Sequence, residues 1–256
     1  MAEWANWSGR QKDSPVAILA PTSEAEIIDA VAMAAEGNLA IRAVGASHSH
    51  SRIAATNGLL LTLDGWQGIE SVDTDNQTAT FRSGSRIYQV GEPLREHGLA
   101  LRNQGDIDRQ SIAGATSTGT HGAGPSLQNL SASVVHARVV LASGDVIDCA
   151  ASTTPELFEI VRHSLGAVGL LSTITVALRS AYRLHETLWA ENPESVFGRI
   201  DQLVADTRHF EFFWMPQTDT CACKSLAETQ DAVNAMPDVK LERVGWNHDI
   251  ISSARN

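Results

Sequence analysis

Residues 111–124 read Ser-Ile-Ala-Gly-Ala-Thr-Ser-Thr-Gly-Thr-His-Gly-Ala-Gly, and the rest of the chain is interpreted outward from them. These fourteen residues include four glycines, three threonines and two serines, but no acidic side chain. Glycine permits positive φ and close backbone approach, so main-chain N–H groups can converge on a ligand. The hydroxyl groups add short donors, and no carboxylate repels an anion. The stretch is therefore a candidate cradle for a diphosphate, and the alternative is a surface loop of small polar residues.

Two common phosphate-binding motifs do not describe this cradle. No Gly-Lys-Ser/Thr follows it, so the lysine that a P-loop places against the β- and γ-phosphates is missing. Gly119, Gly122 and Gly124 also lack the strand–turn–helix setting of a dinucleotide-binding fingerprint. The composition thus favours a diphosphate held by another fold.

Length, charge and cysteine content narrow the class of protein. The chain has 256 residues, which is enough for one large domain or two smaller ones. Its formal net charge of −11 argues against non-specific nucleic-acid binding and against attachment to anionic lipid. Cys149, Cys221 and Cys223 form neither a disulfide framework nor a four-ligand zinc pattern. With no signal peptide and no apolar run near ~18 residues, we expect a cytoplasmic protein without a transmembrane segment.

Hydrophobic periodicity predicts a chain in which strands, hairpins and helices are mixed. Ser23 and Glu26 form the pattern of a capping box, and the alternation in residues 171–179 indicates a half-buried strand. Because hairpins dominate, the expected class is α+β rather than a doubly wound parallel sheet. A second, incomplete unit begins near Tyr182, and the pattern weakens beyond Thr220. Strands are expected at residues 16–19, 40–44, 59–63, 69–73, 78–82, 134–142, 146–149, 171–179, 188–190 and 210–214, and helices at 23–37, 88–97, 155–163 and 193–206.

Two histidines, His48 and His50, lie in a loop of small residues directly after a predicted strand. A His-x-His pair at a strand end can ligate zinc, provided that other strand ends supply further ligands. His121 is the one loop histidine in a comparable setting, but glycines surround it instead of metal ligands. The spacing alone leaves open a zinc site, as in some hydrolases, or two histidines that are satisfied or exposed.

Several segments resemble the aldonolactone and alditol oxidases, FAD-linked enzymes of the vanillyl-alcohol-oxidase superfamily. Residues 44–49, Val-Gly-Ala-Ser-His-Ser, resemble the family's Gly-x-x-His-Ser segment. Residues 103–114 together with 117–122 resemble its second flavin motif, nearly unbroken. Residues 4–9 resemble the start of these enzymes, 165–169 the segment beside the adenine, and 210–219 the entry into the substrate domain. The similarity runs in order over about residues 4–220.

The resemblance implies a PCMH-type FAD-binding domain of two α/β subdomains at residues 10–182, followed by a partial substrate or cap domain at 183–256. It also implies that His48 is bonded covalently to the flavin 8α-methyl group, for which a neutral imidazole is a suitable nucleophile. The alternative is FAD bound non-covalently beside His48. The implied cofactor-binding residues are Ala43, Val44, Gly45, Ala46, Ser47, His48, Ser49, Asp106, Ser111, Gly114, Thr118, Gly119, Thr120, His121, Gly122 and Leu170.

The activity that the resemblance implies is the FAD-dependent oxidation of a CH–OH group. The substrate is expected to be a small polyol or lactone, as for the L-gulonolactone, D-arabinono-1,4-lactone and alditol oxidases. Electrons are expected to pass to O₂ or to another acceptor. Gly105 resembles the family position at the flavin's oxygen-access point, where a glycine leaves room for O₂. The alternative is that Gly105 serves only a turn.

One family feature is missing from this sequence. The relatives typically carry a C-terminal His-Trp-Gly-Lys, whereas this chain has no His-Trp-Gly, and His248 does not match. We therefore expect a truncated chain, or else a divergent member whose complete site requires another chain. We assign no catalytic residue and keep as the alternative function a flavin-binding module without sugar turnover. A half-built second domain is expected to expose apolar surface and to self-associate, with these aromatic residues as donors: Phe210, Phe212, Phe213 and Trp214.

Overall fold

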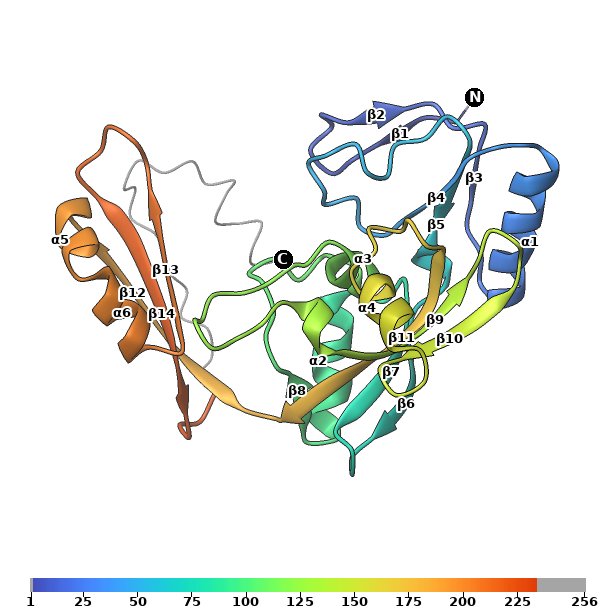
Figure 1. The fold of residues 1–256 in the computed structure, drawn as a ribbon. Helices are drawn as coiled ribbons and strands as arrows, with labels where there is room; N and C mark the ends of the chain where they lie inside the picture. Colours follow the sequence, from blue (N-terminus) through green and yellow to red (C-terminus); the bar gives the residue numbers. More distant parts are fainter. Residues whose placement is uncertain (1, 234–256) are drawn as a thin grey trace. The chain divides into compact units, whose positions relative to one another are not determined.

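The structure is a computed structural model that describes residues 2–233 (Figure 1). Met1 and residues 234–256, which include His248 and the end of the predicted partial domain, lie outside the described residues. The chain divides into two compact units, here called Unit 1 and Unit 2. Unit 1 comprises Met1–Gln104, Asp108–His121 and Gln128–Ser180, and Unit 2 comprises Gly105–Ile107, Gly122–Leu127 and Ala181–Asn256. Two short segments of Unit 2 therefore precede residue 182 in the sequence.

A small parallel sheet forms the first half of Unit 1. Its strands are β3 (Ala17–Leu19), β5 (Leu59–Thr62) and β4 (Ile41–Val44), in that order. Helix α1 (Glu24–Glu36) packs Ile27 and Val31 against Leu61 of β5. The predicted capping box is half formed: Ser23 Oγ accepts from the Glu26 N–H at 3.2 Å. The Glu26 carboxylate instead accepts from the Thr22 N–H at 2.6 Å, so Thr22 rather than Ser23 completes the cap.

A larger antiparallel sheet forms the second half of Unit 1, in the order β10-β9-β11-β7-β6, with β8 paired to β11. The two predicted hairpins are confirmed as β6–β7 and β9–β10. The half-buried alternation predicted for β11 is wrong: Thr173 and Ala177 are buried as well as Ile174. Both edges of β11 are paired, and α1 and α3 also contact it. The bounds are β6 (Ile69–Asp73), β7 (Thr78–Arg82), β8 (Leu99–Leu101), β9 (Val134–Val140), β10 (Val146–Ala150) and β11 (Leu170–Ser180).

Helices and short elements complete Unit 1. The largest core cluster joins Phe81 of β7 and Ile174 of β11 to Leu94 and Ile112 from the helices. At the N-terminus, β1 and β2 form a two-stranded antiparallel hairpin. The bounds are β1 (Trp4–Ala5), β2 (Lys12–Asp13), α2 (Ile87–Glu96), α3 (Ile112–Ser117) and α4 (Pro155–Val161), with 3₁₀ turns η1 (Leu63–Gly65) and η2 (Leu130–Ser133).

Unit 2 contains a three-stranded antiparallel sheet in the order β12-β14-β13, with two short helices. Two predictions fail here. The single helix expected at 193–206 is split, because Arg199 lies outside helical geometry at φ −134° and ψ 21°. The strand β14 was not predicted, although its Cys221 and Cys223 are buried in the core of this unit. The bounds are β12 (Arg183–Glu191), α5 (Pro193–Gly198), α6 (Ile200–Asp206), β13 (His209–Trp214) and β14 (Cys221–Thr229).

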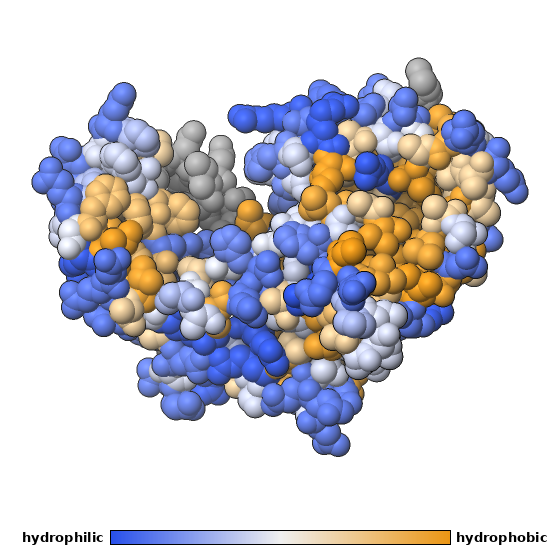
Figure 2. All heavy atoms as spheres, in the orientation of Figure 1, coloured by the Kyte–Doolittle hydropathy of each residue, from blue (hydrophilic) through white to orange (hydrophobic). Residues whose placement is uncertain are grey.

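Exposed apolar surface occurs in both units. Of the four aromatic residues expected to be exposed in Unit 2, Phe213 and Trp214 are 49% and 43% exposed. Phe210 and Phe212 instead pack partly against the core of that unit. Figure 2 shows apolar surface, in orange, on Unit 1 as well. Among the exposed apolar residues of this unit, Ile160 of α4 is 57% exposed. Within residues 2–233, helices are too short or too polar to cross a bilayer.

Candidate cofactor-binding site

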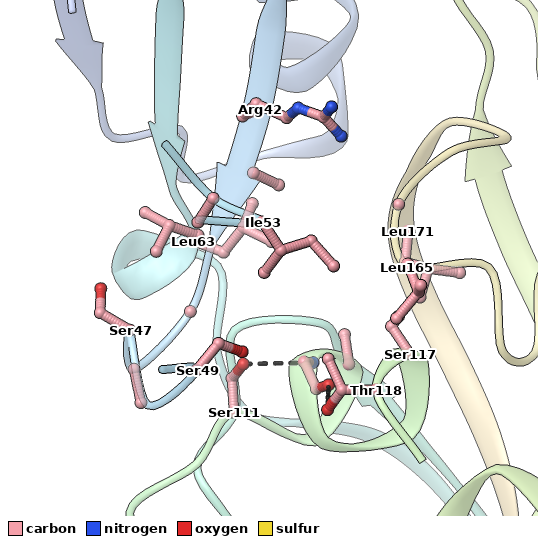
Figure 3. A pocket seen from close by; sticks show the side chains of 18 of the residues that line it. Arg42, Ser47, Ser49, Ile53, Leu63, Ser111, Ser117, Thr118, Leu165 and Leu171 are labelled. Carbon is pink, nitrogen blue, oxygen red and sulfur yellow. Dashed lines mark hydrogen bonds between the residues drawn. The ribbon is translucent and has the colours of Figure 1, made fainter. Parts of the chain in front are cut away.

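A cavity in Unit 1 brings together segments that are far apart in the sequence (Figure 3). Its walls come from residues 41–54, from residues 110–118 and from residues 165–171, with Trp4 and Leu63. In Figure 3, Ser49 and Ser111 lie on one side of the view, and Leu165 and Leu171 lie on the other. Most of the predicted cofactor-binding residues line this cavity, namely Ala43, Val44, Gly45, Ala46, Ser47, His48, Ser49, Ser111, Gly114, Thr118 and Leu170.

The remaining predicted residues are not among those that line the cavity. Asp106 and Gly122 belong to Unit 2, whereas Gly119, Thr120 and His121 follow α3 in Unit 1. Gly119 has φ +69°, and a Cβ placed there would lie 2.9 Å from the imidazole of His163. The space beside Gly119, which the sequence assigned to the cofactor, is therefore filled by a protein side chain.

The first half of the predicted cradle is a helix. Ser111 caps α3, and its Oγ accepts from the Gly114 N–H at 3.3 Å. The next amides are also used within the chain. Ala115 N donates to Ser111 O at 2.8 Å, Thr118 N to Gly114 O at 3.1 Å, and Thr120 N to Ala115 O at 2.9 Å. Helix formation and capping thus satisfy these amides within the chain, and the contact of residues 111–124 with a diphosphate stays a prediction.

The two sequence motifs meet at a close contact between glycine and serine. A Cβ at Gly45 would lie 1.9 Å from Ser111 Oγ, and a Cβ at Gly114 would lie 2.8 Å from the same atom. Ser111 also forms an isolated antiparallel bridge with Arg86. Only glycine allows the backbone after β4 to approach the start of α3 this closely. Gly45 therefore brings the histidine motif and the cradle motif to one wall of the cavity.

His48 lies in an irregular loop, residues 45–51, here called the histidine loop. Its ring stacks on Trp7, with centroids 5.4 Å apart and an interplanar angle of 26°. Burial, together with the positive charge of Arg86 and the neighbouring His50, lowers the pKa of the His48 imidazole. The imidazole is therefore neutral at neutral pH, which is the form in which a ring nitrogen has a lone pair available for nucleophilic attack.

Arg86 is a functional candidate that the sequence did not indicate. Its guanidinium pairs with Asp64 through Nη2, and Nη1 is buried with no hydrogen-bond partner among the described residues. Nη1 would lie 3.6 Å from a Cβ at Gly45, so a positive charge sits beside the histidine loop. No motif marks Arg86, because only the tertiary fold brings the start of α2 next to Gly45. Other lining residues outside the predicted set include Arg42, Ile53, Leu63, Gln110, Ser117 and Leu171.

In Unit 2, Asp106 belongs to a cluster of charged residues. Lys224 Nζ lies 2.6 Å from Asp106 Oδ1 and 2.6 Å from Glu211 Oε1. Burial raises the pKa of the Glu211 carboxyl. Burial opposes the charged form of Lys224, but its bonds to Asp106 and Glu211 outweigh this and raise its pKa. A second hydrogen bond within Unit 2 lies next to Gly122: His209 Nδ1 is 2.8 Å from the carbonyl oxygen of Ala123.

The described residues, 2–233, contain no set of side chains that would support the alternative of a zinc site. Across residues 2–233, no group of three or more His, Cys, Asp or Glu side chains is arranged to hold a metal ion. The three cysteines are free and buried, two of them in the core of Unit 2. Burial raises the pKa of the Cys223 thiol to about 11, so that thiol is protonated at neutral pH.

Comparison with known families places the cavity in a wider context. The model of the FAD binding domain matches residues 15–150, which include β3 to β10 and both motifs that line the cavity. This chain belongs to the FAD-binding domain family. A second model, described as D-arabinono-1,4-lactone oxidase, matches residues 174–252 of the same FAD-binding protein.

Curated relatives of this FAD-binding protein include lactone dehydrogenases and oxidases. The L-gulono-1,4-lactone dehydrogenase of Mycobacterium tuberculosis is 37% identical over 99% of this chain and 57% of its own length. The L-gulonolactone oxidase of Bos taurus is 28% identical over 85% of this chain and 49% of its own length. The chain thus spans about half the length of the curated relatives it matches.

A solved structure with the same fold is the cholesterol oxidase of Brevibacterium sterolicum. It superimposes with a TM-score of 0.81 at 20% identity, covering 89% of this chain and 47% of that one. At this identity the likeness concerns the fold alone. The predicted α+β class and PCMH-type FAD-binding fold are confirmed.

Proposed function

We propose that the protein to which this chain belongs is an FAD-dependent oxidoreductase that acts on a CH–OH group of an aldonolactone or a related polyol. We further propose that Unit 1 holds FAD in the cavity between the histidine loop and α3, with His48 covalently attached to it. The observation that carries the proposal is the contact of Gly45 with Ser111, which gathers both flavin-like motifs around one cavity.

The chemistry of the cavity lining fits FAD, which combines a flat ring system with an anionic diphosphate. The lining mixes small apolar residues with hydroxyl groups, as in Ala46, Ala113, Ser117 and Thr118. None of the described lining residues is Asp or Glu, and Arg42 contributes a positive charge. Arg86 adds a second positive charge behind Gly45. A cofactor of this polarity and charge is favoured over a cation.

The role proposed for His48 is to form a bond between a ring nitrogen and the flavin 8α carbon. One N–H and one C–H bond break as this N–C bond forms. Two protons leave to solvent, and two electrons leave to O₂ or another acceptor. When bound, FAD supplies the two-electron chemistry, and the protein orients it. The neutral His48 imidazole favours the attack, since a protonated ring has no free lone pair.

The proposed substrate class and acceptor come from the names of the relatives. Both a lactone dehydrogenase and a lactone oxidase are similar to this chain. We therefore propose that the electrons pass either to O₂ or to another acceptor. We assign no catalytic residue within the chain. A flavin-binding module without sugar turnover is the second candidate. The exposed Phe213 and Trp214 support the proposal that the isolated chain self-associates.

Acid precipitation of the purified protein tests the proposed linkage. We expect yellow colour in the pellet of the wild type and of His50→Ala, which removes the neighbouring imidazole. His48→Ala is expected to bind FAD that stays in the supernatant. A colourless wild-type pellet with FAD in the supernatant would show that the linkage is wrong. Absence of flavin from both fractions would show that the site is wrong.

Anaerobic addition of L-gulono-1,4-lactone separates the two candidate functions. Loss of the oxidised flavin absorbance would favour the enzyme. A stable oxidised spectrum in protein with full flavin loading would favour the module. Admitting air to photoreduced protein then measures the reaction with O₂, and Gly105→Ala tests whether a small residue at that position matters for it.

A further inference from the structure

The histidine loop has no regular secondary structure of its own. Between β4 and β5, residues 45–51 form no helix or strand, and Ser47 adopts φ +57°, which is uncommon for a residue other than glycine. A loop in that conformation persists only where its surroundings hold it. The question is therefore what fixes the position of His48.

The N-terminal segment supplies most of the bonds that hold this loop. Side-chain N–H groups of this segment, and one backbone amide, donate hydrogen bonds to four consecutive residues of the loop, from Ser47 to His50. The bonds are Trp4 Nε1 to Ser47 Oγ at 3.3 Å, Trp7 N to Ser47 O at 3.2 Å, Trp7 Nε1 to His48 O at 3.0 Å, Asn6 Nδ2 to Ser49 O at 3.0 Å and Gln11 Nε2 to His50 O at 3.0 Å. Beyond the loop, Arg52 pairs with Asp13 of β2 at 3.0 Å.

The N-terminal segment is itself held in one conformation. Asn6 is 4% exposed, and its Oδ1 accepts from Ser8 Oγ at 3.2 Å and from the Gln11 N–H at 3.1 Å. The Asn6 N–H donates to the Gln11 carbonyl at 2.9 Å, next to the pairing of β1 with β2. The Oδ1 atom of Asn6 thus orders the turn between β1 and β2, and its Nδ2 atom binds the backbone of the histidine loop.

Trp7 makes the most direct contact with His48. It donates to the His48 carbonyl, stacks on the His48 ring, and meets the His50 ring edge-on at a centroid distance of 5.5 Å. Trp7 is nevertheless 52% exposed, so it contributes little to the core. A large exposed indole that touches both histidines is better explained by their placement than by stability.

We propose that the N-terminal segment, residues 4–11, is the positioning element for flavin attachment, with Trp7 fixing the imidazole of His48 and Asn6 fixing the backbone of the loop. The inference rests on the proposed function of His48 and adds the residues that set its geometry. The bond proposed above joins two atoms that must meet along a defined direction, while protons leave to solvent and electrons to O₂ or another acceptor. A displacement of about 1 Å can slow such a step about 100-fold.

The test compares two Trp7 variants with a matched control. Trp7→Leu removes both the stacking and the indole N–H, and Trp7→Phe keeps an aromatic ring but removes the N–H. Trp189→Phe in Unit 2 is the control, because it loses a similar indole bond, to Glu191 Oε2 at 2.7 Å, that involves neither the N-terminal segment nor the histidine loop. Each protein is prepared without flavin and given FAD in air. The rate at which flavin becomes acid-stable is measured beside the non-covalent affinity and the melting temperature.

We expect attachment to slow about 10- to 100-fold in Trp7→Leu and less in Trp7→Phe, with FAD affinity and melting temperature close to those of the control. The His48 ring resonances of the flavin-free protein should shift in Trp7→Leu, which a purely structural role elsewhere would not cause. Wild-type attachment rates and unshifted resonances in both variants would overturn the positioning role while leaving the proposed function intact. Absence of covalent flavin in the wild type would overturn the proposed function itself.

Discussion

The histidine loop and residues 111–120 are both rich in small residues and meet at the same cavity, yet they are stabilised differently. From Gly114 to Thr120, the amides are satisfied within the segment through α3 and its caps, and those of Ile112 and Ala113 donate outside it, to Ser85 and Ser83. The histidine loop takes its bonds from a segment about 40 residues earlier in the chain, as with Trp7 and His48. The difference shows that composition alone does not reveal which small-residue segment is open to a ligand. The segment without internal bonds is the one that an external element can orient.

The largest expected effect comes from breaking the junction between the two segments. Gly45→Ala would place a methyl group 1.9 Å from Ser111 Oγ, so the loop must move away from α3. We expect a loss of about 1–3 kcal/mol in unfolding free energy and a loss of flavin retention. The measurements are thermal or urea unfolding and the flavin-to-protein absorbance ratio.

Gly91→Ala is the matched control for this substitution. Gly91 lies inside α2, where an added Cβ meets nothing within 4 Å. Alanine is expected to stabilise the helix by about 0.5–1 kcal/mol without changing the flavin. Full flavin retention in Gly45→Ala would contradict the junction that we describe.

A smaller and more selective effect is expected at Gly119. Alanine there must adopt φ +69° and approach His163, which should cost about 1–2 kcal/mol of stability. Because Gly119 does not line the cavity, the folded variant should retain its flavin, in contrast to Gly45→Ala. Flavin loss with unchanged stability would instead support the original prediction that Gly119 contacts the cofactor.

The smallest expected effect concerns the charge beside the histidine loop. Burial is the main cause of the lowered His48 pKa, and Arg86 adds to it. Arg86→Met should therefore raise that pKa in part, so that the acidic limb of the attachment rate moves to higher pH. Asp64 then loses its partner at little cost, because its side chain is 56% exposed. Arg95→Met, on the exposed side of α2, is the control, and identical pH profiles for the two variants would refute the role of Arg86.

The same His48 shift predicts a direction for stability. A histidine whose folded pKa lies below the unfolded value of about 6.5 contributes stability above that pH. The contribution is lost as the pH falls through the unfolded and then the folded pKa. His48→Ala should therefore flatten the decline of stability on the acidic side of about pH 6.5, as measured by urea unfolding at several pH values.

Much of the fold could be predicted from local sequence patterns. The β6–β7 hairpin matches its predicted residues, because Asp73 caps the turn by accepting from the Asn76 N–H, and Gln77 takes φ +50°. The strand β14 could not be predicted, since its Ala222 and Lys224 have low strand propensity. Pairing on both edges with β12 and β13 stabilises it instead. β13 directly precedes β14 in the chain and pairs with it as a hairpin, with Trp214 opposite Cys221. β12 lies further away in the sequence, so local patterns carry no information about that pairing.

The candidate site divides in the same way. The resemblance located the histidine loop and α3, and the structure brings both to one cavity. The helical state of α3 was missed because Gly114 lowers helix propensity, whereas burial of Ile112 and Ala115 stabilises it. The position of Arg86 beside Gly45 and the hydrogen bond from Asn6 to the histidine loop depend on tertiary contacts alone. No spacing in the sequence marks them.

The most direct test of the account is mass spectrometry of the tryptic peptide that spans residues 43–52, between the cleavage sites at Arg42 and Arg52. This peptide contains both His48 and His50, so fragment ions must assign any modification to one of them. The account predicts a peptide that carries the mass of FAD less two hydrogens, with the added mass on His48. An unmodified peptide from flavin-loaded protein, or a modification on His50, would contradict it.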